Sequence, residues 1–355
     1  MDTDGRRILG EFKNSRNIYL SLEDFVSDKL HSMIKEKNLF VMEISHRTKT
    51  PDSLGKKLSK KNGKYKNIRE VTDLCGMRII CYFSDTVDLV AECLKEKFII
   101  DEVNSVDKRR NLNATEFGYL SLHYICALNE NDCIEHPEFE GIYFEIQIRS
   151  TLQHAWAEIE HDLGYKSEFG VPKKVRREFS RVAGLLEIAD SQFIALRHSV
   201  HEYENMVRTK IGNDDADDIP LDMVSLSEYV RINKAFKSFL EDICSQCNAE
   251  YEIISPENYL KQLAYLKIET IGDLGRLLED NKDSAKAMMV KRLKSFELDI
   301  FSTNMALRYL CRAKLLTDGY SKNQVEEFVR LAIDDEERIQ MYVNKIIDAQ
   351  KVPSN

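Results

Sequence analysis

The sequence predicts an α+β fold, in which a mixed β-sheet flanked by helices is followed by an all-helical C-terminal domain. Three short runs, residues 77–83, 119–128 and 142–149, have the length and residue types that are typical of strands. A helical pattern over residues 86–97 separates the first two runs. From residue 221 to residue 350 the apolar residues recur at helical spacing, which indicates helices throughout that part.

The chain begins with a predicted amphipathic helix and continues into a basic stretch. Within residues 18–44, apolar side chains recur at helical spacing: Ile18, Leu22, Phe25, Val26, Leu30, Met33 and Ile34. Between Arg47 and Arg69, nine residues are Lys or Arg and one, Asp52, is acidic. In a chain of formal net charge −9 this stretch suggests a local site for a polyanion, although a solvated helix face would have the same composition.

The predicted strands each have one polar face. Alternation along the last strand puts Glu145, Gln147 and Arg149 on one face and isoleucines and Phe144 on the other. On the middle strand, Tyr119, Ser121 and His123 share a face in the same way. Two such faces close to a basic stretch predict a polar cleft.

Two helical segments follow the last strand. Residues 151–166 carry an apolar stripe opposite His154, Glu158 and His161. From Val175 to Val207, ten apolar or small residues recur at alternating steps of four and three, as in a coiled-coil seam. Such a seam has to be buried against another helix of the chain or of a neighbouring subunit, so we expect a homo-oligomer formed through helices.

An acidic stretch suggests where the domains divide. Residues 212–220 contain four aspartates and are the best candidate for a linker, which predicts domains at 15–210 and 221–355 with a linker at 211–220. The eight cysteines have no regular spacing, and no segment approaches the roughly 18 consecutive apolar residues of a membrane span. We therefore expect a cytoplasmic protein that does not enter a membrane.

The polar residues have the chemistry that phosphoryl transfer to a hydroxyl group requires. Cations neutralise the phosphates, and carboxylates such as Asp73 and Glu145 are natural ligands for Mg²⁺. The sequence contains neither of the common glycine-rich phosphate loops, so side chains have to hold the phosphates. These residues alone leave a nucleotide-transfer enzyme as one of several options.

Five motifs resolve this choice by resemblance. The chain resembles the RelA/SpoT-type synthetase domains, including the small alarmone synthetases, over roughly residues 15–205. The motifs are R-T-K-T-P-D-S at 47–53, D-L-C-G-M-R-I-I at 73–80, F-G-Y-L-S-L-H at 117–123, F-E-I-Q-I-R-S at 144–150 and H-A-W-A-E-I-E-H at 154–161.

The resemblance implies a nucleotidyltransferase-like fold and a GTP pyrophosphokinase that transfers pyrophosphate from ATP to GDP or GTP, makes the alarmones ppGpp or pppGpp and releases AMP. It implies Asp73 and Glu145 as Mg²⁺ ligands, with Glu145 taking the proton of the 3′-hydroxyl. The ATP-binding residues would be Arg47, Lys49, Ser53, Lys57, Lys60 and Arg78, and the residues around the acceptor nucleotide would be Tyr119, His123, Gln147 and His154.

Two departures from the family pattern concern the acceptor. Typical members have a Lys before the G-Y motif and an Arg after its Tyr, where this chain has Thr115 and Leu120. Lys108, Arg109 and Arg110 are nearby cations that could replace them. The alternatives are a toxic synthetase that modifies the 3′ end of tRNA or an adenine nucleotide, a hydrolase that uses His154, Glu158 and His161, and a non-catalytic scaffold.

Overall fold

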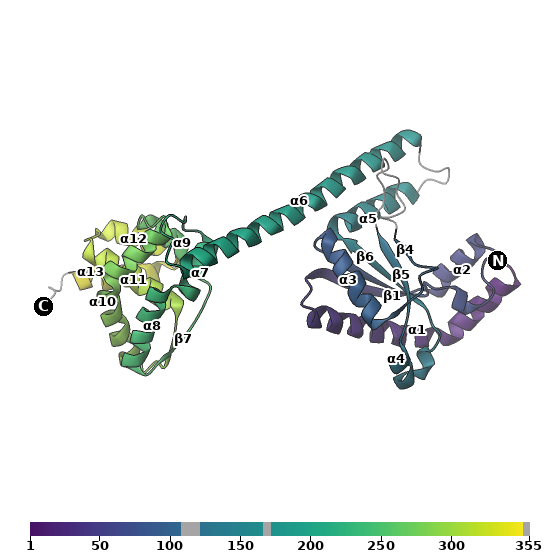
Figure 1. Ribbon diagram of the computed structural model, residues 1–355, viewed down its shortest axis with the longest axis horizontal. Helices are drawn as coiled ribbons and strands as arrows, with labels where there is room; N and C mark the ends of the chain where they lie inside the picture. Colours follow the sequence, from purple (N-terminus) through teal and green to yellow (C-terminus); the bar gives the residue numbers. More distant parts are fainter. Residues whose placement is uncertain (108–120, 166–171, 351–355) are drawn as a thin grey trace. The chain divides into compact units, whose positions relative to one another are not determined.

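The computed structural model describes residues 1–107, 121–165 and 172–350. The chain forms two compact units, Met1–Arg197 and His198–Asn355 (Figure 1). The boundary lies inside one continuous helix, α6 (Lys173–Gly212), which begins in the first unit and ends in the second. The predicted Tyr119 site and the positions of Thr115, Leu120 and Lys108 lie outside the described residues.

The first unit is built on a mixed sheet. Its strand order is β1-β2-β6-β5-β3, with β4 paired to β5. The pair β2 and β6 is parallel and the other pairs are antiparallel. The strands are β1 (Val41–Thr48), β2 (Cys75–Cys81), β3 (Ile99–Ile100), β4 (Val106–Asp107), β5 (Leu122–Ala127) and β6 (Phe144–Ser150).

Helices cover the apolar face of this sheet. The helix α1 is capped by the carboxylate of Asp2, which accepts a hydrogen bond from the Gly5 amide at 2.8 Å. Side chains of α1 and α3 share one buried core with β2 and β6, including Phe12, Leu94, Ile79 and Phe144. The helices of this unit before α6 are α1 (Thr3–Glu36), α2 (Pro51–Lys60), α3 (Ser84–Lys97), α4 (Glu130–Glu135) and α5 (Thr151–Tyr165), with 3₁₀ turns at Ile68–Glu70 and Pro137–Phe139.

The second unit is a cluster of helices with its own core. Buried residues such as Val207, Tyr229, Phe236 and Leu307 join its helices. Its elements after α6 are α7 (Met223–Ile232), α8 (Lys234–Cys247), β7 (Glu250–Glu252), the 3₁₀ turn Glu257–Tyr259, α9 (Leu260–Tyr265), α10 (Ile271–Ser295), β8 (Ile300–Ser302), α11 (Thr303–Thr317), α12 (Lys322–Arg330) and α13 (Glu336–Gln350). The strands β7 and β8 form a small parallel pair that the helical pattern did not predict.

The predicted α+β class and the helical C-terminal part are confirmed. The three predicted strands correspond to β2, β5 and β6, and the helix around 86–97 corresponds to α3. The strand β1 was not predicted, because the first helix was expected to continue to residue 44 and ends at Glu36 instead. Within the predicted helical part, Asn233 ends α7 and caps α8 through its side chain.

The acidic stretch at 212–220 packs on the second unit through two of its residues, while its four aspartates are exposed. Ala216 and Ile219 are buried in the core of the second unit, and the carbonyl of Ile219 accepts a hydrogen bond from the Ile271 amide. The stretch lies inside the second compact unit, which begins at His198. The start at residue 15 also differs, since α1 begins at Thr3 and its residues Ile8 and Phe12 are buried in the first unit.

Candidate active site

The polar face of the first sheet carries two rows of paired residues. In one row Arg47 pairs with Gly76, and Gly76 pairs with Glu145. In the next row Ser45 pairs with Arg78, Arg78 with Gln147 and Gln147 with His123. Because paired residues of neighbouring strands share a face, each row brings its side chains to the same side of the sheet. The predicted polar faces of β5 and β6 are thus joined by residues of β1 and β2.

Glu145 is held ionised by its neighbours on this face. One oxygen, Oε1, lies 2.7 Å from Nδ1 of His123, and Oε2 accepts a hydrogen bond of 3.0 Å from Nε2 of Gln147. Burial by itself would raise the pKa of Glu145, but the contact with His123 and the bond from Gln147 outweigh it and lower the pKa below its ordinary value. Arg149 in turn donates to Oε1 of Gln147 at 2.8 Å, which orients that amide.

Asp73 has a cation on each carboxylate oxygen. Nζ of Lys49 lies 3.0 Å from Oδ2, and Nζ of Lys57 lies 2.6 Å from Oδ1. Burial by itself would raise the pKa of Asp73, yet the two lysines outweigh it and lower the pKa below its ordinary value. Nζ of Lys57 also lies 5.6 Å from the centroid of the Tyr65 ring, within the range of a cation–π contact.

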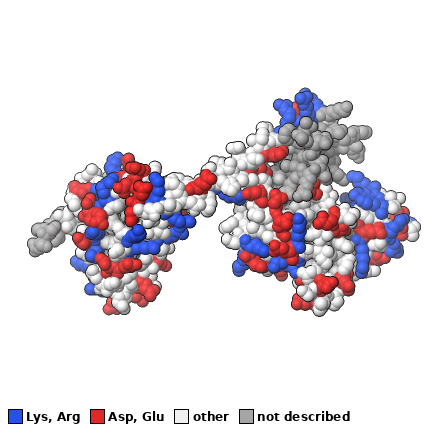
Figure 2. Space-filling model, viewed as in Figure 1, with Lys and Arg blue, Asp and Glu red and all other residues white. Residues whose placement is uncertain are grey.

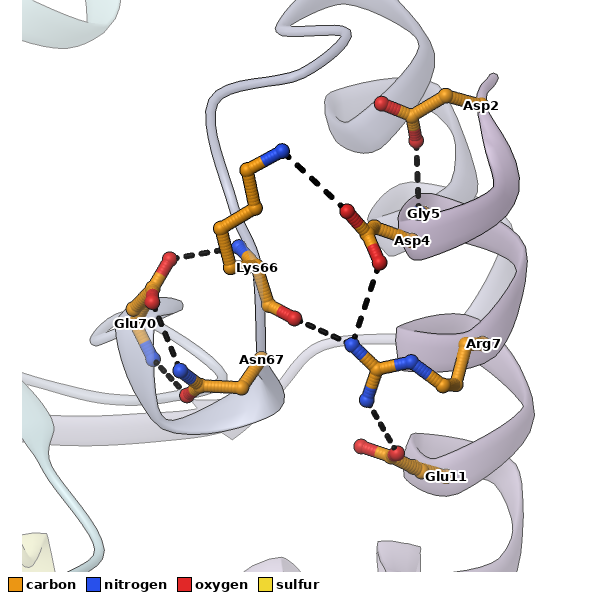
Figure 3. A network of polar contacts seen from close by, with 8 residues as sticks. All are labelled: Asp2, Asp4, Gly5, Arg7, Glu11, Lys66, Asn67 and Glu70. Carbon is orange, nitrogen blue, oxygen red and sulfur yellow. Dashed lines mark hydrogen bonds and ion pairs between the residues drawn. The ribbon is translucent and has the colours of Figure 1, made fainter.

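The loop between α2 and Asp73 is fastened to the start of α1 (Figure 3). The guanidinium of Arg7 donates to the carbonyl of Lys66, and the ammonium of Lys66 lies 3.3 Å from Asp4. The amide of Lys66 donates to Glu70 at 2.6 Å. The N-terminal part of α1 thereby fixes the loop that leads from α2, which carries Lys57, to Asp73.

A cavity of about 140 Å³ opens where these groups meet. Six of the predicted site residues line it: Arg47, Lys49, Asp73, Arg78, Glu145 and Gln147. Four further lining residues were not predicted: Ser45, His46, Gly76 and Met77. Three of these four lie within or beside the quoted motifs, but their residue types carry no signal for nucleotide chemistry. His46 is held from α1, since its Nδ1 lies 2.7 Å from Oε1 of the buried Glu23.

Glu158 on α5, which was not predicted as a residue of this site, contacts two residues that were predicted. Nη1 of Arg78 lies 3.2 Å from Oε1 of Glu158, and Nδ1 of His154 lies 3.8 Å from the same oxygen. Burial and the positive charge of Arg78 lower the pKa of His154. Glu158 is thus an ion-pair partner of Arg78. Among the described residues, no group of three or more His, Cys, Asp or Glu side chains is arranged to hold a metal ion.

Other predicted residues lie at the margin of the site. Ser53 and Lys60 are exposed on α2 and do not line the cavity. Figure 2 shows Lys and Arg gathered on the part of the first unit where α2 lies. A metal ion at this site would have to be shared with a substrate, because the protein offers the two carboxylates Asp73 and Glu145. Their fit is supported by their position in one cavity and by the effect of the Asp73 charge, which acts to raise the pKa of Glu145.

Residues 46–169 match the family model described as the region found in RelA / SpoT proteins. This segment contains Arg47, Asp73, Arg78 and Glu145, so the part of the chain that forms the site is a RelA/SpoT-type domain. The resemblance drawn from the five motifs is confirmed.

Two curated proteins that are similar to this chain are both named GTP pyrophosphokinases. The GTP pyrophosphokinase YjbM of Bacillus subtilis (strain 168) is 28% identical over 162 residues, which cover 45% of this chain and 73% of YjbM. The GTP pyrophosphokinase YwaC of the same organism is 27% identical over 205 residues, which cover 56% of this chain and 95% of YwaC.

Solved structures of small alarmone synthetases also match part of the chain. Small alarmone synthetase 1 from Bacillus subtilis has a TM-score of 0.45 at 23% identity and covers 54% of this chain and 99% of its own. Small alarmone synthetase 2 from the same organism has a TM-score of 0.45 at 26% identity, with 53% and 99% covered. Each of these matches covers about half of this chain.

Proposed function

We propose that this protein is a GTP pyrophosphokinase that transfers the β,γ-pyrophosphoryl group of ATP to the 3′-hydroxyl of GDP or GTP. The proposal rests on one observation, which is that two carboxylates and three basic side chains line the same cavity. These are Asp73, Glu145, Arg47, Lys49 and Arg78. The cavity lies in the segment that matches the RelA/SpoT family, and the two curated relatives are themselves named GTP pyrophosphokinases.

The donor nucleotide would occupy the side of the cavity formed by β1, β2 and α2. Arg47 and Arg78 carry planar guanidinium groups that can stack on the adenine base. The ammonium groups of Lys49, Lys57 and Lys60 would neutralise the triphosphate, and Ser53 near the start of α2 would donate a hydrogen bond to it. Asp73 and Glu145 would hold Mg²⁺, which would supply positive charge against the phosphate oxygens of ATP.

The acceptor would approach from the side of β5 and β6. Tyr119 would stack on the guanine, and His123, Gln147 and His154 would surround the acceptor. The 3′-oxygen attacks the β-phosphorus of ATP, its proton passes to Glu145, and the bond from the β-phosphorus to the α,β-bridging oxygen breaks as AMP leaves. The pKa of Glu145 is lowered despite its burial, so its carboxylate stays ionised at neutral pH and can accept the proton.

The test is incubation of the full chain with ATP labelled in its β- and γ-phosphates and with GDP, GTP, ATP or tRNA as acceptor. We expect label on a guanine nucleotide and an equal amount of AMP. Label on tRNA or on an adenine nucleotide would instead support the alternative acceptors that Thr115 and Leu120 left open. No AMP with any acceptor would support a scaffold and would contradict the proposal.

We further propose that two copies of the chain associate through α6. Its predicted seam is only partly covered within the chain: Phe193, Leu196 and Val200 are 48%, 59% and 53% exposed, as are Val175 and Val182 at 41% and 47%. An apolar stripe of this length on one helix favours a helical partner.

Residues 221–355 have no motif of nucleotide chemistry, so we propose that they regulate or assemble the enzyme. No helix in the described residues is long and apolar enough to cross a membrane. The proposed substrates are cytoplasmic nucleotides, and we place the enzyme in the cytoplasm on that ground.

A further inference from the structure

Asp73, one of the two carboxylates assigned to the metal, has a lysine ammonium beside each of its oxygens. Lys49 reaches Oδ2 at 3.0 Å, and Lys57 reaches Oδ1 at 2.6 Å. Both lysine side chains are mostly buried, with exposures of 15% and 21%. Ion pairs in such surroundings are less screened than surface pairs, so solvent does not readily separate them.

The two lysines come from elements that hold them in place. Lys49 follows directly after β1, and its backbone amide donates to the carbonyl of Leu74 at 2.8 Å, next to Asp73. Lys57 lies on α2, with its ammonium between Asp73 and the face of the buried Tyr65 ring. The pairs are therefore set by the fold rather than by long, freely moving side chains.

Glu145 differs in the charge of its partners. Its oxygens meet Gln147, which is neutral, and His123. Without nucleotide, Asp73 thus contacts two ammonium groups. Among the hydrogen bonds and ion pairs of the described residues, Glu145 contacts no lysine or arginine. A divalent cation that approached Asp73 alone would face both ammonium groups at close range.

We propose that Lys49 and Lys57 close Asp73 to free divalent metal ions, and that the carboxylate becomes a metal ligand only when a polyphosphate draws the two ammonium groups away. This inference rests on the proposed function for the assignment of the polyphosphate to ATP. A triphosphate carries several negative charges against one on Asp73, so it competes effectively for the lysines. The exchange leaves every charge paired: ammonium groups on the phosphates, and Asp73 on the metal.

The consequence is an order of binding. The metal enters with the nucleotide or after it, and the protein without nucleotide does not hold the metal at Asp73. The lysines thus have two partners in sequence, first the carboxylate and then the phosphates.

The experiment measures Mn²⁺ binding to the full chain in the absence of any nucleotide, by the loss of the free-ion signal in electron paramagnetic resonance. The wild type is compared with the Lys49→Gln/Lys57→Gln double variant, which removes both charges and keeps polar, unbranched side chains. We expect the double variant to bind Mn²⁺ more tightly than the wild type by on the order of tenfold or more. Adding Asp73→Asn to the double variant should abolish the gain, which assigns it to Asp73.

The matched control is Lys56→Gln, because Lys56 is exposed on the same helix and does not line the cavity. It should leave Mn²⁺ binding at the wild-type level. Circular dichroism checks that each variant is folded, and the single variants Lys49→Gln and Lys57→Gln carry the test if the double variant does not fold.

Two results would overturn the inference. One is a wild type that binds Mn²⁺ at Asp73 as tightly as the double variant, and the other is a folded double variant with no gain. The transfer assay with labelled ATP is separate, because the metal titration contains no nucleotide. If the double variant gains Mn²⁺ affinity but the wild type transfers no pyrophosphate, the proposed function is rejected and the closed state of Asp73 is kept. If the wild type transfers pyrophosphate but the double variant shows no gain, the proposed function is kept and the closed state is rejected.

Discussion

Each of the two units contains a carboxylate that has a lowered pKa and two basic partners, but only one of these two carboxylates lines the candidate active site. In the second unit, Glu228 is buried and receives Arg208 at 3.2 Å and Arg231 at 2.6 Å. In the first unit, Asp73 receives Lys49 and Lys57 and lines a cavity with Glu145. Glu228 is not among the residues that line this cavity. Ion pairing and a lowered pKa therefore do not identify a site by themselves, and convergence on a cavity is the distinguishing feature.

The strongest test of this contrast replaces one carboxylate in each unit. Glu145→Gln and Asp73→Asn should each lower pyrophosphate transfer by about a hundredfold or more, because each removes charge from the reacting centre at nearly constant shape. Glu228→Gln should leave the rate unchanged and lower the thermal stability of the second unit. Turnover is measured with labelled ATP and unfolding by calorimetry. Near-normal transfer in Glu145→Gln would show that the cavity has been misassigned.

A second test separates the two nucleotides. Arg78→Ala should raise KM for ATP by about tenfold with a smaller effect on the acceptor, because a lost base-stacking contact costs about 1–3 kcal/mol. Glu158→Gln should raise the same constant by a smaller factor, since it only releases Arg78 from its partner on α5. Initial rates at varied ATP and varied acceptor decide between them. An equal rise in both constants would mean that Arg78 does not belong to the donor alone.

A third test concerns the helix that runs through both units. Phe193→Asp places a charge in the exposed stripe of α6, so it should abolish association of copies while the chain stays folded. Leu89→Asp on α3 is a matched control, because Leu89 is 55% exposed and lies outside the stripe. Light scattering gives the mass of each variant. A wild type that is monomeric at working concentrations would remove α6 from consideration as an interface.

The smallest expected effect is at Asp190, which accepts a hydrogen bond of 2.6 Å from Ser150 at the end of β6. Burial raises the pKa of Asp190, so the folded chain prefers its protonated form and loses stability as the pH rises through that raised value. Asp190→Asn stays neutral and should unfold about 2 °C above the wild type near pH 8, with little difference near pH 4. A wild type that is the more stable protein near pH 8 would contradict the sign of this effect.

Local patterns were sufficient for the strand that carries most of the site. The alternation from Phe144 to Arg149 predicted both the buried face and the polar face of β6. The edge strand β1 was missed because only β2 pairs with it, which leaves Met42 at 52% exposure and its pattern of apolar residues weak. The pair of Arg78 and Glu158 joins residues eighty positions apart through the packing of α5, and no single-sequence pattern contains that information.

The predicted linker at 211–220 rests on composition alone. Composition showed aspartates at 214–218, but not that Ala216 and Ile219 supply apolar side chains to the second core. Burial depends on the partners that the fold brings, whereas composition records only the average polarity of a stretch.

The continuous helix across the unit boundary has a consequence for proteolysis. A protease binds its substrate in an extended form, and every residue between Lys173 and Gly212 is helical, so cleavage at Arg197 would require several turns to unwind first. The peptide bonds after Arg197 and Arg208 both lie inside α6, where the backbone amides form helical hydrogen bonds. This holds for Arg197 even though it lies at the boundary between the two units. Mild trypsin treatment should therefore leave the two units joined for longer than their separate cores would suggest, and the persistence of the intact chain measures how firmly α6 keeps its helical form.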